Sequence, residues 1–148
     1  MSKTTLFIGS SSSAKSQAKA LVKELTSDLV EFLPWWDSFT PGRLLLEELD
    51  AIQSKVNGAL LLFSPESKAK VRQQTKWIPN LNVLFEFGYF YGKFGKNRVA
   101  MIKYGDLFLP SDFGGYTWIT GSTFFKPSAV VQVGKRTRND FKKWVQQV

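Results

Sequence analysis

The chain contains neither cysteine nor histidine. The lack of cysteine excludes disulfides and thiolate metal sites and is fully compatible with a reducing compartment. The lack of histidine excludes imidazole general bases, Ser-His and Cys-His nucleophilic systems and His-ligated metals. Any catalysis must therefore come from carboxylates, hydroxyls, amines or the backbone, and no metal site is expected.

Long apolar runs are missing as well. The N-terminal stretch Leu6-Phe7-Ile8 is too short for a signal peptide or a membrane span, and the run from Ala59 to Phe63 is only as long as a strand. We therefore expect a cytoplasmic protein without a membrane partner. The 148 residues are 43% hydrophobic and 22% charged with no shift in composition, which predicts one globular domain over residues 1–148.

Acidic residues are outnumbered, because 20 Lys and Arg against 12 Asp and Glu give a formal charge of +8. Such a charge attracts acidic partners or a small phosphorylated ligand. The basic residues are spread along the chain without an Arg/Gly-rich tract or a zinc finger, which favours a solvated basic surface over nucleic-acid binding. Six basic residues lie in the C-terminal stretch: Lys126, Lys135, Arg136, Arg138, Lys142 and Lys143.

The hydrophobic pattern alternates between strand and helix. Strands are predicted at residues 4–8, 29–33, 58–63, 99–103 and 116–119. Helices are predicted around residues 18–25, from about residue 43, at 81–94 and from about residue 138. In the second of these, Leu45, Leu49, Ile52 and Val56 are expected to face inward. The polar stretch from Glu66 to Lys76 is expected to be a loop or a ragged helix. This alternation predicts an α/β fold, with a single doubly wound, flavodoxin-like parallel sheet of five strands and helices on both faces.

The loop after the first predicted strand is a candidate ligand site, because ligands of open parallel sheets bind beyond the carboxyl ends of the strands. Gly9, Ser10 and Ser11 offer backbone N–H groups and hydroxyls at a positive helix end, which suits a phosphate or a ribose. A serine N-cap in a tight turn is the simpler alternative.

The loop after the second predicted strand is unusually aromatic. Trp35, Trp36 and Phe39 lie there beside proline and glycine, and such side chains are costly to expose. They either stack on a ring such as nicotinamide or adenine, or pack over the edge of the sheet or against a neighbouring protomer.

Glu86 is a carboxylate in an otherwise apolar and aromatic helix. It falls in one narrow polar stripe with Asn82, Tyr89 and Lys93, and such a stripe is usually exposed to solvent. The bulky aromatic neighbours of Glu86 instead predict a partly dry recess. Desolvation there raises the pKa of the carboxyl group and strengthens its effect on a developing positive charge.

Four motifs in this order resemble a known family. They are Leu-Phe-Ile-Gly-Ser-Ser-Ser near the N-terminus, Trp-Trp-x-x-Phe-x-Pro-Gly, Asn-Val-Leu-Phe-Glu-Phe-Gly at residues 82–88, and Leu-Pro-Ser-Asp-Phe-x-Gly at residues 109–115. Together they resemble the bacterial Toll/interleukin-1 receptor (TIR)-like domains of the predicted nucleotide-binding type. In anti-phage systems these domains are fused to sensors of cyclic nucleotides, including bacterial STING. The resemblance covers essentially the whole chain.

The resemblance implies NAD glycohydrolase activity, with NAD as the substrate and no cofactor. Glu86, in the Phe-Glu-x-Gly motif, would be the catalytic residue. The residues that would line the NAD pocket are Gly9, Ser10, Ser11, Trp36, Phe39 and Asp112. One departure is that Asn80-Leu81 replaces the Arg-Asp that many relatives carry at this point, which bears on any charge-dependent anchoring or assembly role there.

The resemblance also implies that TIR domains pack together to complete the site. Self-association through TIR–TIR contacts would then activate the protein, and an isolated domain would have low activity. A cyclic-nucleotide sensor, as a fused domain or a partner, would provide the signal in anti-phage defence.

The implied chemistry agrees with the lack of histidine. Nicotinamide leaves NAD readily without being protonated, and one carboxylate can stabilise the oxocarbenium-like ribose that remains, which contributes ~3–4 kcal/mol. Water, or the adenine base, then attacks. Two alternatives stay open: a non-catalytic TIR scaffold, and an enzyme similar to nucleoside deoxyribosyltransferases that acts on deoxynucleosides and ignores NAD.

Overall fold

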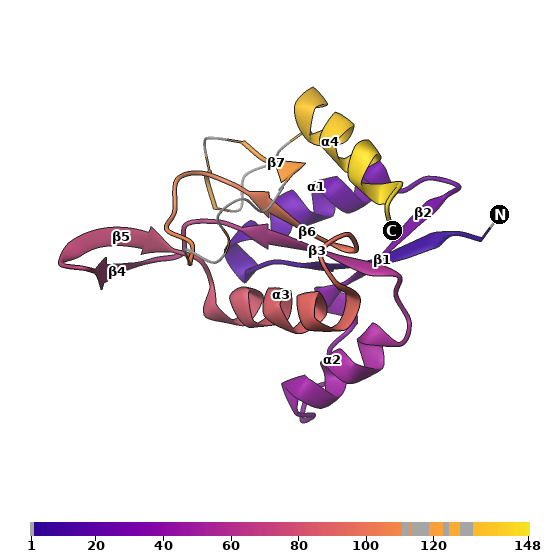
Figure 1. Ribbon diagram of the computed structural model, residues 1–148, viewed down its shortest axis with the longest axis horizontal. Helices are drawn as coiled ribbons and strands as arrows, with labels where there is room; N and C mark the ends of the chain where they lie inside the picture. Colours follow the sequence, from indigo (N-terminus) through magenta and orange to yellow (C-terminus); the bar gives the residue numbers. More distant parts are fainter. Residues whose placement is uncertain (1, 111–112, 114–118, 123–124, 128–131) are drawn as a thin grey trace.

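The computed structural model describes residues 2–110, 113, 119–122, 125–127 and 132–148 (Figure 1). Within these ranges the sheet strands are β1 (Thr4–Gly9), β2 (Val30–Pro34), β3 (Gly58–Phe63), β6 (Val99–Lys103) and β7 (Ile119–Thr120). They form one sheet in the order β2-β1-β3-β6-β7, and every pairing is parallel. This order is that of a doubly wound, flavodoxin-like sheet, so the predicted fold class is confirmed.

In the described part of the chain, four α-helices cover the two faces of the sheet (Figure 1). Helices α1 (Lys15–Leu25) and α4 (Lys135–Val145) lie on one face, and α2 (Leu45–Gln53) and α3 (Leu81–Phe94) lie on the other. Two short 3-10 turns, η1 (Ser12–Ala14) and η2 (Trp35–Asp37), follow β1 and β2. Among the helices described, none is long and apolar enough to cross a membrane.

The core has two halves because successive side chains of each strand point to opposite faces. Leu60, Leu62 and Ile102 pack under α1 and α4, on what we call the α1 face. Phe7, Leu61 and Met101 pack under α2 and α3, on the α3 face. The central strand β3 is buried along its whole length, as its continuous apolar run predicts.

The polar stretch after β3 is a β-hairpin, so its prediction as a loop or ragged helix is wrong. Strands β4 (Ser67–Val71) and β5 (Gln74–Ile78) pair antiparallel and project beyond the sheet (Figure 1). Arg72 and Gln73 form the turn with positive φ angles of 50° and 68°. One face of the hairpin is exposed and the other is only partly buried, so the alternation of Ala69 and Val71 with lysines is short and weak. The turn also lacks the glycine or asparagine that marks a hairpin.

Several element ends differ from the prediction. Helix α2 begins at Leu45, whose side chain is exposed rather than inward, because Glu48, Leu49 and Ile52 form its buried face. Helix α4 begins at Lys135, about one turn earlier than predicted. Of the predicted fifth strand, residues 116–118 lie outside the described part of the chain, and β7 is described at Ile119 and Thr120.

Candidate active site

Helix α3 begins at a side-chain cap. The Asn80 side-chain oxygen accepts hydrogen bonds from the backbone N–H groups of Asn82 at 2.9 Å and Val83 at 3.1 Å. Such a cap satisfies N–H groups that the first helical turn leaves without partners. Asn80 therefore fixes the start of the helix that carries Glu86.

The buried face of α3 consists of Val83, Glu86, Phe87 and Phe90, at helical spacing. Glu86 is 6% exposed, whereas Asn82 and Lys93 of the predicted polar stripe are exposed. Its Oε2 atom has no hydrogen-bond partner among the described residues. Burial raises the pKa of Glu86 from 4.5 to about 8. The predicted dry recess with its raised pKa is therefore present.

Gly9, the last residue of β1, makes room for this carboxyl group. A Cβ atom at position 9 would lie 2.8 Å from Oε2 of Glu86, 2.7 Å from Cδ1 of Leu61 and 2.9 Å from Cε2 of Phe7. No side chain fits in that space without displacing its neighbours. Gly9 thus brings the Glu86 carboxyl group against the backbone at the carboxyl end of β1, where ligands of such sheets bind.

The burial of the Glu86 carboxyl group decides how it responds to a positive charge. With a pKa of about 8, Glu86 is mainly protonated at neutral pH in the free protein. A positive charge brought beside it would favour the ionised form, because the two charges attract strongly where water is excluded. Glu86 is therefore suited to stabilise a cationic group or a cation that develops during a reaction.

The serine loop after β1 is joined to a second carboxylate. Ser13 donates to both carboxylate oxygens of Glu66, at 2.8 and 2.5 Å, and its hydroxyl lies 3.1 Å from that of Ser11. Ser64, directly after β3, donates to Glu66 at 3.4 Å. Ser11 also caps η1, since its hydroxyl accepts from the Ala14 N–H at 3.2 Å.

Glu66 changes what the serine loop can bind. A carboxylate among the serine hydroxyls repels a phosphate and accepts hydrogen bonds from neutral hydroxyl groups, so the loop suits a ribose better than a phosphate. Reasoning from the sequence missed Glu66 and Ser13 because Glu66 opens a polar stretch without periodicity. The available signal was its position just after the most apolar strand.

The aromatic loop divides between the two faces of the sheet. The Trp35 indole N–H donates to the Ser10 hydroxyl at 2.8 Å, and Trp35 packs against the α3 face. Phe39 packs edge-on against Phe7 with ring centroids 6.3 Å apart, on the same face as Glu86. Trp36 instead packs against the α1 face. Its ring lies edge-on to that of Trp35 with centroids 5.8 Å apart, and the Lys15 ammonium lies 5.7 Å from both rings.

The structure therefore brings Gly9, Phe39 and Glu86 together on the α3 face, with Ser10 and Ser11 at the adjoining rim. Trp36 lies on the other face, and Trp35 takes the position beside Ser10. Asp112 lies outside the described residues. Its neighbour Phe113 packs on Phe87 with ring centroids 5.0 Å apart. Within the described ranges, no group of three or more acidic side chains could hold a metal ion.

A doubly wound five-stranded parallel sheet, with a buried glutamate on the helix that packs on β3 and β6 and a glycine at the end of β1 beside it, defines the chain as a TIR-like α/β domain. The chain belongs to the CAP12/Pycsar effector TIR domain family, whose model matches residues 5–123.

Individual relatives agree with this family. The chain is 33% identical over 115 residues to CD-NTase-associated protein 12 of Sphingobacterium faecium, which covers 78% of this chain and 35% of that protein. It is 30% identical over 145 residues to the Pycsar effector protein PaPycTIR of Pseudomonas aeruginosa, covering 93% of this chain and 47% of that protein. Protein tirC of Dictyostelium discoideum is 34% identical over 90 residues, 53% of this chain and 45% of that protein. The chain thus spans between about a third and a half of the length of these relatives.

Proposed function

We propose that this TIR domain hydrolyses the bond between nicotinamide and ribose in NAD, with Glu86 as the catalytic carboxylate. The observation that carries the proposal is the buried, unpartnered Glu86 carboxyl group against Gly9. Burying an ionisable group without a partner costs free energy, and such groups cluster at functional sites. A substrate that carries a positive charge to this position would compensate that cost.

NAD carries such a charge on its nicotinamide ring. In the proposed reaction the C–N glycosidic bond breaks and its electron pair leaves with nicotinamide, which becomes neutral. The positive charge moves to the ribose, where the ionised Glu86 stabilises it. Water then adds its oxygen to the ribose carbon and loses a proton, so the products are nicotinamide, ADP-ribose and a proton. No step needs histidine, a metal or a second cofactor.

The rim beside Glu86 supports a sugar at this position. The hydroxyls of Ser11 and Ser13 and the Glu66 carboxylate form one hydrogen-bonded group next to Gly9 and Ser10. Sugar hydroxyls both donate and accept hydrogen bonds, so they can join such a group. Phe39 and Phe7 provide an apolar wall on the same face.

Exposed apolar side chains support activation by assembly. Leu81 is 67% exposed and Phe85 is 47% exposed, one turn apart on α3. Apolar side chains gathered at the surface favour association. In line with the names of its relatives, we place the domain in anti-phage defence, joined to or regulated by a sensor of cyclic nucleotides.

The decisive experiment compares NAD cleavage by the parent, Glu86→Gln and Glu47→Gln, at high protein concentration with a crowding agent. Glu47 is an exposed carboxylate on α2, so Glu47→Gln makes the same chemical change away from the site. We expect Glu86→Gln to lower nicotinamide release by about 100-fold or more and Glu47→Gln to leave it unchanged. Equal release by the parent and a folded Glu86→Gln would contradict the role of Glu86.

The same assay separates the other functions. No release from NAD by an assembled parent would favour a scaffold, and cleavage of deoxynucleosides but not of NAD would favour the deoxyribosyltransferase-like enzyme. The pH profile adds an independent test. Because the reaction needs ionised Glu86, kcat/KM of the parent should rise with pH and level off above about 8.

A further inference from the structure

A cavity of about 640 Å³ lies on the α1 face, on the opposite side of the sheet from Glu86. Its walls are α1, the ends of β6 and β7, and the start of α4, and we call it the α4 cavity. Its lining includes Gln17, Tyr104, Lys126, Lys135 and Arg136. The volume is in the range of pockets that bind small molecules.

The charge of the α4 cavity has one sign. Lys126, Lys135 and Arg136 are the charged residues among those described as lining it, and all are cationic. Two carboxylates on the adjoining elements α1 and α4 are hydrogen-bonded. Asp140 accepts from the Thr120 N–H at 3.1 Å, and Glu24 binds Arg138 and Val133. An anion entering the cavity would be attracted by the three cationic side chains, and the pairing of Glu24 with Arg138 offsets the charge of that carboxylate.

Helix α4 begins at this cavity. Its N-cap is Gly134, which has no side chain to bond the first N–H groups, and its first turn contains no acidic residue. The start of a helix carries a partial positive charge and N–H groups directed outward, which together bind phosphate well. Lys135 and Arg136 in this first turn add two full charges to that partial charge.

The side-chain oxygen of Gln17, in the cavity wall, needs a hydrogen-bond donor. Gln17 is 3% exposed and lines the cavity, and its Oε1 atom has no hydrogen-bond partner. Its amide nitrogen donates to the Lys126 carbonyl oxygen at 3.1 Å, which holds the amide at the wall. A buried acceptor without a donor is costly, and a ligand hydroxyl or amino group would satisfy it.

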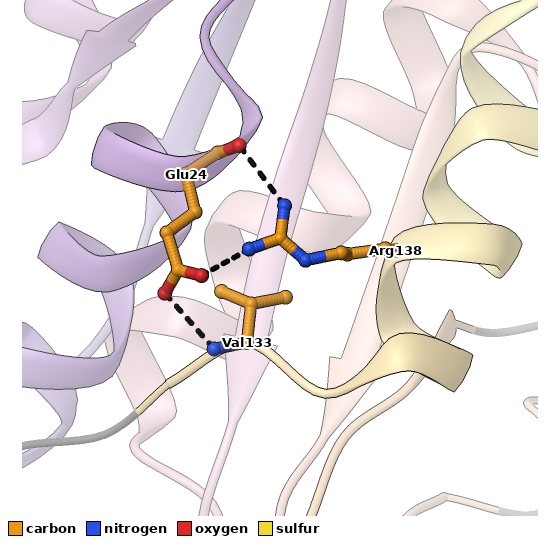
Figure 2. A network of polar contacts seen from close by, with 3 residues as sticks. All are labelled: Glu24, Val133 and Arg138. Carbon is orange, nitrogen blue, oxygen red and sulfur yellow. Dashed lines mark hydrogen bonds and ion pairs between the residues drawn. The ribbon is translucent and has the colours of Figure 1, made fainter.

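The walls of the cavity are held in place by α1 (Figure 2). Glu24 accepts a hydrogen bond from the Val133 N–H at 2.9 Å and pairs with Arg138 of α4. Thr137 donates its hydroxyl to the Thr120 carbonyl oxygen at 2.5 Å, which fixes α4 to β7. The start of α4 and Gln17 are thus parts of one braced frame, as a preformed binding site requires.

We propose that the α4 cavity binds a small phosphate ester, with the phosphate at the start of α4 and a hydroxyl or amino group on Oε1 of Gln17. Sugar phosphates and nucleoside monophosphates carry both groups and match the size of the cavity. Tyr104, nearly buried in the wall, provides an aromatic surface. The site is separate from Glu86, so the proposal does not depend on NAD cleavage.

The test is calorimetric titration of the whole chain with adenosine monophosphate, ribose 5-phosphate, inorganic phosphate and adenosine. We expect the two phosphate esters to bind more tightly than inorganic phosphate, and adenosine not to bind at millimolar concentration. The double variant Lys135→Ala/Arg136→Ala should weaken the esters by about tenfold or more, since two charges at the phosphate are lost. Both residues are exposed, so the variant should fold.

The matched control is Lys142→Ala/Lys143→Ala, which removes the same charge from the other end of α4. It should change affinity by less than about twofold, because exposed charges at that distance are screened by salt. Gln17→Met should reduce ester affinity to that of inorganic phosphate. Glu86→Gln should leave ester binding unchanged.

Three results would overturn the proposal. One is the absence of binding by either ester at millimolar concentration. Another is an equal loss of ester affinity in Lys135→Ala/Arg136→Ala and Lys142→Ala/Lys143→Ala, which would show a general effect of charge. The third is a self-association of the chain that Lys135→Ala/Arg136→Ala abolishes while no ester binds, which would show that the cavity receives a second copy of the protein.

Discussion

Glu66 and Glu86 lie near the ends of neighbouring strands, and the protein holds their carboxyl groups in opposite ways. Glu66 follows β3 and accepts hydrogen bonds from the hydroxyls of Ser13 and Ser64. Glu86 is buried beside Gly9, and its Oε2 atom has no partner. Hydrogen bonds stabilise a carboxylate, whereas burial without them favours its neutral form. Glu66 thus stabilises the serine loop, whereas the Glu86 carboxyl group remains available to interact with a substrate.

The largest expected effect concerns Glu86 and pH. The pKa of Glu86 is raised from 4.5 to about 8 on folding, so the folded parent binds a proton that the unfolded chain releases. The free energy of unfolding of the parent should therefore fall as pH rises through this window, by ~1.4 kcal/mol per pH unit, whereas Glu86→Gln does not titrate. In urea denaturation at several pH values, the free energy of unfolding of Glu86→Gln relative to that of the parent should increase up to pH about 8.

Glu47→Gln provides the control for that series, because Glu47 is exposed on α2. Its stability relative to the parent should be nearly constant over the same pH values. A Glu86→Gln curve that runs parallel to the Glu47→Gln curve would show that Glu86 is solvated or paired in solution.

The next largest effect concerns the space that Gly9 leaves for Glu86. Gly9→Ala should lower the free energy of unfolding by ~1–3 kcal/mol, because a Cβ there meets Glu86, Leu61 and Phe7 within 3 Å. Gly92→Ala is the matched control, since a Cβ at this position in α3 meets nothing within 4 Å. That variant should stabilise the protein by ~0.5–1 kcal/mol. Equal effects of the two changes, measured by thermal and urea unfolding, would rule out the tight contact at Gly9.

A smaller loss of stability is expected at Glu66. Glu66→Ala removes the acceptor of the Ser13 and Ser64 hydroxyls and should cost ~1–2 kcal/mol, whereas Glu66→Gln keeps one acceptor oxygen and should cost less. Urea unfolding measures both. If Glu66→Ala proved as stable as the parent, the serine loop would not depend on this carboxylate. Glu66 would then have no structural role to set against the role of Glu86.

The smallest effect separates the two tryptophans. Trp35→Phe removes the hydrogen bond from the indole N–H to Ser10 and should cost ~0.5–1.5 kcal/mol on top of the lost ring contacts. Trp36→Phe loses a similar ring area on the α1 face. A Ser10→Ala background should therefore reduce the cost of Trp35→Phe and leave that of Trp36→Phe unchanged, as a double-mutant cycle measures.

The sequence determined the fold class and pointed to Glu86. The continuous apolar run of β3 and the alternation of strands with helices predict a doubly wound sheet, because buried parallel strands need apolar side chains on both faces. The lone carboxylate in the helix 81–94 is a local signal, since its neighbours in the sequence are apolar. The β4–β5 hairpin was missed because its largely exposed strands carry only the short alternation of Ala69 and Val71 with lysines.

Only the tertiary structure decided how the site is assembled. The contact of Glu86 with Gly9, the bonding of Glu66 to the serine loop and the α4 cavity each join residues far apart in the chain. The division of Trp35 and Trp36 between two faces depends on a 3-10 turn at the edge of the sheet. Such contacts depend on packing in three dimensions, whereas periodicity in a sequence reports only which face of its own element a residue occupies.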